Sequence, residues 1–346
     1  MTAEPSRPLR VFVVGAGAFG RNHLRVYREL ASAGLPLTIV AAVDSDPAAL
    51  SRASADFGVP AFPSIAAALQ VLGAPDAASI CVPTNHHAAA AEPLLTAGVH
   101  CLIEKPLAAS LEDADRILSL ASRHSAHVQT GHLERFNPAV AAARMRLNRP
   151  MFFEAHRLSI FTPRSLDVDV VLDLMIHDLD IVLSFVDSPV REIRAVGLPI
   201  LSGKADIANV RLEFENGCIA NFTASRVSTE RVRKLRFFQP REYLSLDFAR
   251  QDLLLIGVDE AATPDSVLHA ALAQATSGAF HASPGLSLHN VEVACGEPLR
   301  LEIESFVTTI QTGAAPVVTG EDGRRALALA LSINEAIRAH AARAKL

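Results

Sequence analysis

The sequence predicts an α/β fold in which an N-terminal doubly wound parallel sheet is followed by an α+β domain with an open, mostly antiparallel sheet. In the first third of the 346 residues, short apolar runs alternate with helical patterns, which is typical of a parallel sheet covered by helices on both faces. After about residue 132, strand-like runs follow one another with few helices between them, which favours antiparallel pairing. We expect domains over residues 1–130 and 131–320, followed by a C-terminal helix over 321–346.

The elements of the first domain are predicted from their apolar patterns. Five short apolar runs bounded by turn residues are expected to be strands, and the segments between them have helical spacing. The predicted strands cover residues 9–15, 38–44, 78–83, 100–106 and 127–132. The predicted helices run from the first strand to about residue 30 and over 47–57, 87–97 and 111–124.

The second domain is predicted to be rich in strands. MFFEAHRLS is a strand candidate, and the Asn216-Gly217 pair is a strong hairpin signal between two alternating runs. The predicted strands cover 151–159, 193–199, 207–217, 218–227, 234–240, 242–248 and 252–258. Helices are predicted over 169–186, 297–312 and 321–345, and residues 259–290 are expected to be irregular.

Composition excludes several classes of partner. The net charge is −5 and no basic face stands out, so we expect neither nucleic acid nor an anionic membrane as a partner. No apolar run of about 18 residues and no signal-peptide core is present, which predicts a cytoplasmic protein. The four cysteines are widely spaced without a CxxC pair, so we expect reduced thiols and no metal site.

A glycine pattern after the first strand predicts a dinucleotide site. VVGAGAFG places Gly15, Gly17 and Gly20 between a strand and a helix. Gly15 permits the tight turn, Gly17 lets a pyrophosphate approach the backbone, and Gly20 lets helix and strand pack closely. The second predicted strand ends in Asp44, whose carboxylate can bind ribose hydroxyls and repel a 2′-phosphate. The pattern therefore predicts NAD rather than NADP as the cofactor.

The tripeptide Glu104-Lys105-Pro106 ends the fourth apolar run of the first domain. Ligands of parallel sheets bind at the carboxyl ends of strands, so one of the two charged side chains is expected to face the ligand. A lysine beside the cofactor can bind a substrate hydroxyl and move its proton. Pro106 would fix the turn, for which a cis bond is one solution. A surface ion pair at a strand end is the alternative interpretation.

The run DLMIHDLD places four ionisable groups within an otherwise apolar helix. At helical spacing Asp173, His177 and Asp180 lie along one stripe, and Asp178 points about a quarter-turn away. A carboxylate beside an imidazole can set its tautomer so that it acts as an acid or a base. A metal site, the His-Asp pair of metal phosphohydrolases and a buried structural network are the other interpretations.

Taken in order, GAGAFG, EKP and DLMIHDLD resemble the glucose–fructose oxidoreductase / inositol dehydrogenase family (Gfo/Idh/MocA) over nearly the whole chain. PTNHHAAAAEPLLTAGVHCLIEKP and EDGRRALALALSINEAIRA are similar to two further segments of that family. The resemblance implies an NAD-binding Rossmann domain, and it assigns catalysis to Lys105, Asp173 and His177. Where the family usually has glycines before its aspartate, this chain has VDVVLD, so the loop on the substrate side can differ.

Motif and resemblance together define the candidate site residues. Expected cofactor contacts are Gly15, Gly17, Ala18, Phe19, Gly20, Asp44, Pro83, Thr84, His87, Glu104 and Lys105. Expected substrate contacts are Lys105, Arg135, Asn137, Arg157, Arg164, Asp173 and His177, because arginine forks match the oxygens of a diphosphate. The sequence alone leaves open whether Lys105 or His177 is the general base.

Within the family, GHLERFNPAV and DVDVVLDLMIHDLDI most resemble the UDP-N-acetylglucosamine 3-dehydrogenases. This resemblance implies oxidation of the C3 hydroxyl to a ketone, which an aminotransferase then converts to an amine and which in bacteria can feed a lipid A variant. The alternatives are oxidation of an inositol or another unactivated sugar, and a non-catalytic NAD-dependent sensor.

Alternating polarity in the second domain predicts a homo-oligomer. One face of residues 207–217 carries Val210, Leu212 and Phe214, while the opposite face is only partly polar. A sheet face that no helix covers is a candidate subunit interface, and members of the family commonly pair through this sheet. We expect a dimer or a dimer of dimers with contacts centred on residues 207–256.

Overall fold

A computed structural model describes residues 7–161, 168–258 and 286–345, and these form two compact units. The first unit combines the chain up to Phe136 with Glu297–Ala328, and the second combines Asn137–Gly296 with the chain from Leu329 onward. The units therefore divide the chain at different places from the predicted boundaries at 130 and 320. Residues 297–320, which the sequence analysis placed in the second domain, return to the first unit.

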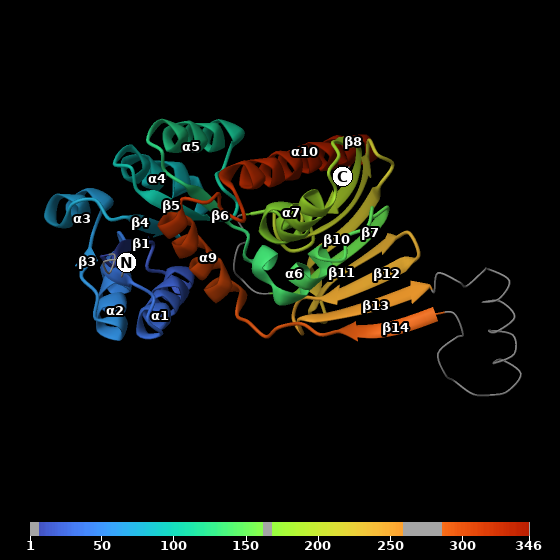
Figure 1. Ribbon diagram of the computed structural model, residues 1–346. Coiled ribbons are helices and arrows are strands. Elements are labelled where there is room, and N and C mark those ends of the chain that lie inside the picture. The colour runs from blue at the N-terminus through green and yellow to red at the C-terminus, as the bar shows by residue number, and fades with distance from the viewer. Residues whose placement is uncertain (1–6, 162–167, 259–285, 346) are drawn as a thin grey trace, which may run out of the picture. The chain divides into compact units, whose positions relative to one another are not determined.

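The first unit contains a six-stranded parallel sheet in the order β3-β2-β1-β4-β5-β6. Helices cover both faces, with α1, α2 and α9 on one and α4 and α5 on the other (Figure 1). Its strands are β1 Leu9–Val14, β2 Leu37–Val43, β3 Ala61–Phe62, β4 Ala77–Ile80, β5 His100–Glu104 and β6 Val128–Gly131. Its helices are α1 Ala18–Ser32, α2 Pro47–Phe57, α3 Ile65–Leu72, η1 Thr84–His86, α4 His87–Thr96, α5 Leu111–Arg123, η2 Leu133–Phe136 and α9 Pro298–Thr312.

The helix α9 belongs to the first unit because its apolar face completes the core there. Ile303 and Phe306 are fully buried and pack in one cluster with Leu24 and Tyr27 of α1. At about 25 cal/mol per Å² of buried apolar surface, each side chain of this size stabilises the folded state by about 2 kcal/mol. A sequence pattern shows that α9 is amphipathic, but it does not show which sheet the helix covers.

Several short elements of the described chain were not predicted, among them one strand and two helices. The strand β3 has only two residues, and α3 is a run of eight that begins at the N-cap Ser64. The third is α6 (Pro138–Arg144), where the side chain of Asn137 caps the helix by accepting the amide hydrogen of Ala139. Elements of this length carry too few residues for a clear period.

The second unit contains an eight-stranded sheet in the order β14-β13-β12-β11-β7-β10-β9-β8. All neighbours pair antiparallel except β7 and β10, which are parallel. Its strands are β7 Phe152–Ile160, β8 Val190–Leu198, β9 Ile207–Phe214, β10 Ile219–Ser228, β11 Val232–Gln239, β12 Glu242–Asp247, β13 Asp252–Val258 and β14 Leu286–Val291. Its helices are α6, η3 Val171–Met175, α7 Ile176–Phe185 and the C-terminal half of α10 Gly320–Ala344.

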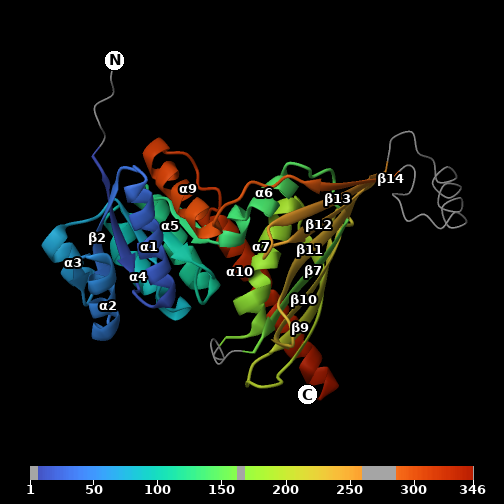
Figure 2. The same cartoon turned by 90° about the horizontal axis from the view of Figure 1, so that it is seen from below.

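Helices cover one face of this sheet, and no described helix lies on the other (Figure 2). The alternation predicted for β9 is confirmed, because Val210, Leu212 and Phe214 are fully buried. In β10, Ser225 departs from the predicted alternation and is buried, next to a register shift that ends regular pairing with β7. The strand β14 was not predicted, and the remaining residues of the expected irregular segment lie outside the described chain. None of the described helices is long and apolar enough to span a bilayer.

Candidate active site

The turn between β1 and α1 has the geometry that its glycines predict. Gly15 has a φ of +91°, and a Cβ there would lie 2.7 Å from the backbone of Cys81. A Cβ on Gly20 would lie 1.7 Å from the carbonyl oxygen of Gly15, so only glycine lets the helix start this close to the strand. A Cβ on Gly17 would meet nothing within 4 Å. The backbone of Gly17 is therefore open to a ligand at the start of α1.

Asp44 follows β2 and is fixed by the backbone around the turn. One carboxylate oxygen accepts the amide hydrogen of Ala16 at 2.7 Å, and the other accepts that of Asp46 at 2.9 Å. These bonds hold the carboxylate next to the glycine turn while its remaining lone pairs can still accept hydrogen bonds. Asp44 is thus placed where the sequence analysis expected it, beside the start of α1.

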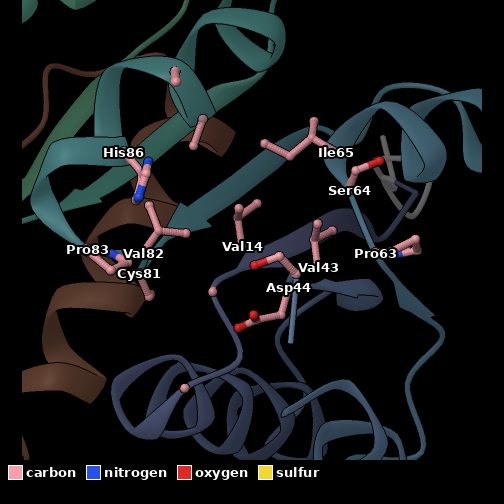
Figure 3. Close-up of a pocket in the computed structure, with 15 residues that line it drawn as sticks. Val14, Val43, Asp44, Pro63, Ser64, Ile65, Cys81, Val82, Pro83 and His86 are labelled. Carbon is pink, nitrogen blue, oxygen red and sulfur yellow. The ribbon is translucent and has the colours of Figure 1, made fainter. Parts of the chain in front are cut away.

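A pocket lies at the carboxyl ends of β1, β2 and β4 (Figure 3). Asp44 lies in it with Ser64 and Ile65 on one side and Pro83 and His86 on the other. Four of the expected cofactor residues line the pocket, namely Gly15, Gly17, Asp44 and Pro83. The sequence analysis did not name the other lining residues, Val14, Val43, Ser45, Pro63, Ser64, Ile65, Cys81, Val82, His86, Ala89 and Ala90.

The pocket fits a dinucleotide with an unphosphorylated adenosine ribose. Its floor is the open backbone at Gly17, its one charged lining residue is Asp44, and none of its described lining residues is a lysine or arginine. A helix N-terminus binds a pyrophosphate, and an aspartate at the end of the second strand binds ribose hydroxyls. Gly15, Gly17 and Asp44 would hold NAD in this pocket, and NAD would supply a hydride acceptor.

Lys105 follows the last residue of β5 and is half-buried. The Lys105–Pro106 peptide bond is cis, which is the solution that the sequence analysis considered for this turn. His87 is buried beside it, with Nδ1 3.0 Å from the Pro106 carbonyl oxygen and Nε2 2.9 Å from that of Val82. Burial lowers the pKa of His87 while these carbonyls and the charge of Glu104 oppose the shift, so a neutral ring donates to one carbonyl only.

His87 therefore links the end of β4 to the turn after β5 and does not line the described pocket. Of the other expected cofactor residues, Ala18 and Phe19 are exposed in the first turn of α1, and Thr84 is half-buried at the start of η1. His87 is buried within hydrogen-bond distance of two backbone carbonyls. Ala18, Phe19 and Thr84 remain candidates for contact with a bound dinucleotide.

In the second unit, a π-helical turn precedes α7 and carries Asp173. Such turns are rare and frequently occur at functional sites. Asp169 holds its start, because one carboxylate oxygen accepts the amide hydrogens of Val171 and Leu172 at 3.0 Å. Asp173 and His177 are half-buried, whereas Asp178 and Asp180 are 2% exposed.

A buried ion pair accounts for Asp178. Arg157 of β7 donates from Nε and Nη2 to its two carboxylate oxygens at 2.9 and 2.8 Å, and the guanidinium lies over the ring of Phe248. Arg157 is 4% exposed, so this placement favours a structural role over phosphate binding. Two of the four ionisable groups in DLMIHDLD thus lie within the fold, and the other two are accessible for chemistry.

The other expected substrate contacts are also largely buried. Arg135 is 9% exposed, with a guanidinium nitrogen 3.9 Å from the carboxylate of Asp322, and Asn137 donates to the carbonyl oxygen of Phe248. Arg164 lies outside the described residues. Lys105 belongs to the first unit, and Asp173 and His177 belong to the second. In the described chain, no three His, Cys, Asp or Glu side chains gather as a metal site would require.

Family models match most of the chain. The model described as "Oxidoreductase family, NAD-binding Rossmann fold" matches residues 9–132, and the Gfo/Idh/MocA C-terminal domain matches residues 139–239. The first of these ranges covers the glycine turn, Asp44 and Lys105, and the second covers Asp173 and His177. The motifs therefore occur along the chain in the same order as the two matched domains.

Named dehydrogenases match nearly the whole chain. A UDP-N-acetylglucosamine 3-dehydrogenase from Acidithiobacillus ferrooxidans is 35% identical over 96% of this chain and 98% of its own. An inositol 2-dehydrogenase from Rhizobium meliloti is 26% identical over 93% of this chain and 94% of its own.

Solved structures show the same architecture. The UDP-N-acetylglucosamine 3-dehydrogenase of Acidithiobacillus ferrooxidans superimposes with a TM-score of 0.84, covering 96% of this chain and 98% of its own. A dehydrogenase from Bordetella pertussis, solved with NADH and UDP-GlcNAcA, superimposes with a TM-score of 0.76 at 17% identity, covering 97% of each chain. The second comparison supports the fold alone.

Proposed function

We propose that this chain, which belongs to the Gfo/Idh/MocA oxidoreductase family, oxidises the C3 hydroxyl of UDP-N-acetylglucosamine to a ketone with NAD. The observation that supports this most strongly is the similarity to a dehydrogenase of that specificity, which extends over 96% of the chain. The pocket supports the choice of cofactor, because Asp44 is placed to bind ribose hydroxyls. The product would be a 3-keto sugar nucleotide, the kind of compound that an aminotransferase consumes.

The chemistry requires a base and a hydride acceptor. Bound NAD would supply the hydride acceptor for C3, and a side chain of the protein would take the hydroxyl proton as the carbonyl forms. Lys105 and His177 are the candidates for that base, since each is half-buried and a neutral amine or imidazole can accept the hydroxyl proton. Asp173 would orient the imidazole and balance its charge. The remaining rate enhancement would come from holding the substrate hydroxyl between the base and the hydride acceptor.

A substrate panel tests this proposal. We expect NADH to form, measured by its absorbance, with UDP-N-acetylglucosamine and not with myo-inositol or unactivated N-acetylglucosamine at equal concentrations. Myo-inositol is the main alternative substrate, because an inositol 2-dehydrogenase is among the relatives. Turnover of myo-inositol alone would replace the proposed substrate with a polyol. Stoichiometric binding of NAD and sugar without NADH would instead support a sensor.

Cofactor preference is expected to depend on Asp44. With NADP, the carboxylate would repel the 2′-phosphate and would lose its hydrogen bond to the ribose. Together these two effects would disfavour NADP by about 1–3 kcal/mol. We therefore expect kcat/KM to be roughly tenfold to a hundredfold higher with NAD than with NADP. Asp44→Ser should narrow this ratio, while Asp46→Ser, which removes a carboxylate outside the pocket lining and keeps a capping residue at the start of α2, should leave it unchanged. Equal use of the two cofactors by the parent enzyme would contradict the assignment.

The outer face of the second sheet supports the proposed homo-oligomer. An apolar row crosses five strands, because the register pairs Phe152 with Phe238, Phe238 with Tyr243, Tyr243 with Ile256 and Ile256 with Leu288. The rings of Phe238 and Tyr243 are 4.9 Å apart, and Phe238 and Leu288 are 40% and 59% exposed. A contiguous apolar row on an uncovered sheet is typical of an interface. Three of its five members lie in residues 207–256.

Light scattering tests this assembly. We expect a mass of about 74 kDa or its double at micromolar concentration, compared with 36.9 kDa for one chain. Phe238→Glu places a charge in the middle of the row and is expected to produce monomers. Val71→Glu, at a 69% exposed position of α3, should leave the mass unchanged. A parent protein that elutes as a monomer would exclude this interface.

A further inference from the structure

A buried group of polar side chains lies in the first unit, next to the strand β5, which ends at Glu104 just before Lys105. Glu302 of α9 is fully buried, and neither oxygen of its carboxyl group has a hydrogen-bond partner among the described residues. Leaving an ionised carboxylate in such a place costs several kcal/mol. Buried polar groups without a partner are rare, so this one requires a physical explanation.

Two neighbouring side chains share this property. Gln129 of β6 donates from Nε2 to the backbone carbonyl of Glu302 at 3.1 Å, and its own Oε1 has no described partner. His23 of α1 lies with Nε2 3.1 Å from a carboxylate oxygen of Glu104, and its Nδ1 also has no described partner. Polar atoms of this kind, presented by three adjacent elements, are typically completed by ordered water.

The fold makes room for Glu104 within this group. A Cβ on Gly131 of β6 would lie 2.9 Å from the carboxyl carbon of Glu104, so only glycine leaves space for that side chain. Glu104 is 8% exposed and directly precedes Lys105. Whatever fixes the Glu104 side chain therefore also restrains the backbone from which the Lys105 turn begins.

The charges around Glu302 favour its neutral form. Burial raises the pKa of Glu302 well above its usual range, and the negative charge of Glu104 adds to this shift. Tyr27 of α1 and Cys81 after β4 also face the group, and burial raises the pKa of both, so they stay uncharged near neutral pH. On η2, which packs against α9, Arg135 lies 3.9 Å from Asp322.

We propose that Glu302 is a positioning residue, which as a neutral carboxylic acid joins His23 and Glu104 in a buried hydrogen-bonded network that holds the Lys105 turn. The contact to Glu104 runs directly or through ordered water. This inference rests on the proposed function only for the role of Lys105. When Glu302 ionises as the pH rises, it loses the proton that it donates and is repelled by Glu104, so the turn loosens and turnover falls.

The stability of Glu302→Gln tests the protonation without an activity assay. The folded state keeps a proton that the unfolded chain releases above about pH 4.3, so the parent loses stability as pH rises from there to the folded pKa. Glutamine has no proton to release. The melting temperature of Glu302→Gln should therefore rise relative to the parent between pH 5 and pH 9. Glu304→Gln, a half-buried control on the same helix, should follow the parent. Parallel curves for Glu302→Gln and the parent would overturn the proposal.

The pH profile of kcat tests the link to Lys105. The parent is expected to lose turnover as the pH rises through the pKa of Glu302, whereas Glu302→Gln should lack this decline and keep a neutral-pH kcat within about twofold of the parent. Glu302→Leu fills the space without a hydrogen-bonding group, so it should lower kcat about tenfold with the Kd for NAD unchanged. Superimposable profiles, or full activity of Glu302→Leu, would show that Glu302 does not position the lysine.

Failure of this inference and failure of the proposed function are distinguishable. If the parent oxidises no sugar nucleotide, the proposed function is wrong, while the melting curves and the infrared carbonyl band of a protonated carboxylic acid still report on Glu302. That band is expected in the parent and absent in Glu302→Gln. Its absence from the parent would contradict a neutral Glu302 whatever the substrate.

Discussion

Lys105→Met is expected to lower kcat by about a hundredfold to ten-thousandfold, the usual contribution of a general acid–base group. Methionine has a similar length and no proton to exchange, so the half-buried site should stay filled. The Kd for NAD should be little changed, because Gly15, Gly17 and Asp44 line the pocket from other strands. Steady-state kinetics and a fluorescence titration with NADH measure the two quantities.

The matched control is Lys204→Met, which removes an exposed lysine from a loop of the second unit and should leave kcat unchanged. If Lys105→Met keeps near-full turnover, the lysine is only part of the turn, and His177 is the remaining candidate for the base. If it loses NAD binding together with turnover, its role is to hold the cofactor.

His177→Ala is expected to have the second-largest effect, also about a hundredfold or more in kcat. The half-buried imidazole follows a π-helical turn and is four residues from Asp173, a carboxylate that can orient it. If His177 is the base, turnover of the parent should fall as pH drops through the pKa of the imidazole, and this acid limb should disappear in the variant.

His289→Ala, at an exposed position of β14, serves as the control and should retain the parent profile. Asp173→Asn should reduce kcat less than His177→Ala does, because asparagine still accepts a hydrogen bond but no longer balances a charge. Full activity of His177→Ala would place the imidazole in the structural network instead.

The sequence was sufficient for the parts of the fold that local patterns encode. The strands β1, β2 and β5 of the first sheet are largely apolar runs, and Gly15, Gly17 and Gly20 specify the turn that follows β1. In the second sheet, the alternation of Val210, Leu212 and Phe214 correctly identified the covered face. Each of these predictions depends on residues that are adjacent in the chain.

Long-range contacts could not be predicted in the same way. No sequence period shows that α9 returns to the first unit, or that Arg157 pairs with Asp178 across 21 positions of the chain. For that reason the sequence analysis counted Arg157 as a phosphate ligand, whereas the structure places it in a buried ion pair. His87 is a similar case, since its partners are two backbone carbonyls on different loops.

Some of the pocket residues that were missed come from short segments. Ser64 and Ile65 belong to the start of α3, after a strand of only two residues, and no motif in the sequence identified them. His86 lines the pocket, whereas its neighbour His87, which the resemblance favoured, is turned into the fold. Adjacent histidines at a helix start face different directions, and only three-dimensional packing decides between them.

The proposed oxidation at C3 is tested with UDP-N-acetylglucosamine that carries deuterium at C3. We expect the deuterium to appear at C4 of the reduced nicotinamide, together with a C3 ketone in the sugar, when the products are analysed by mass spectrometry and NMR. Undeuterated NADH formed from this substrate would show that the hydride leaves another carbon. No reduction of NAD by the sugar nucleotide at all would contradict the proposed activity.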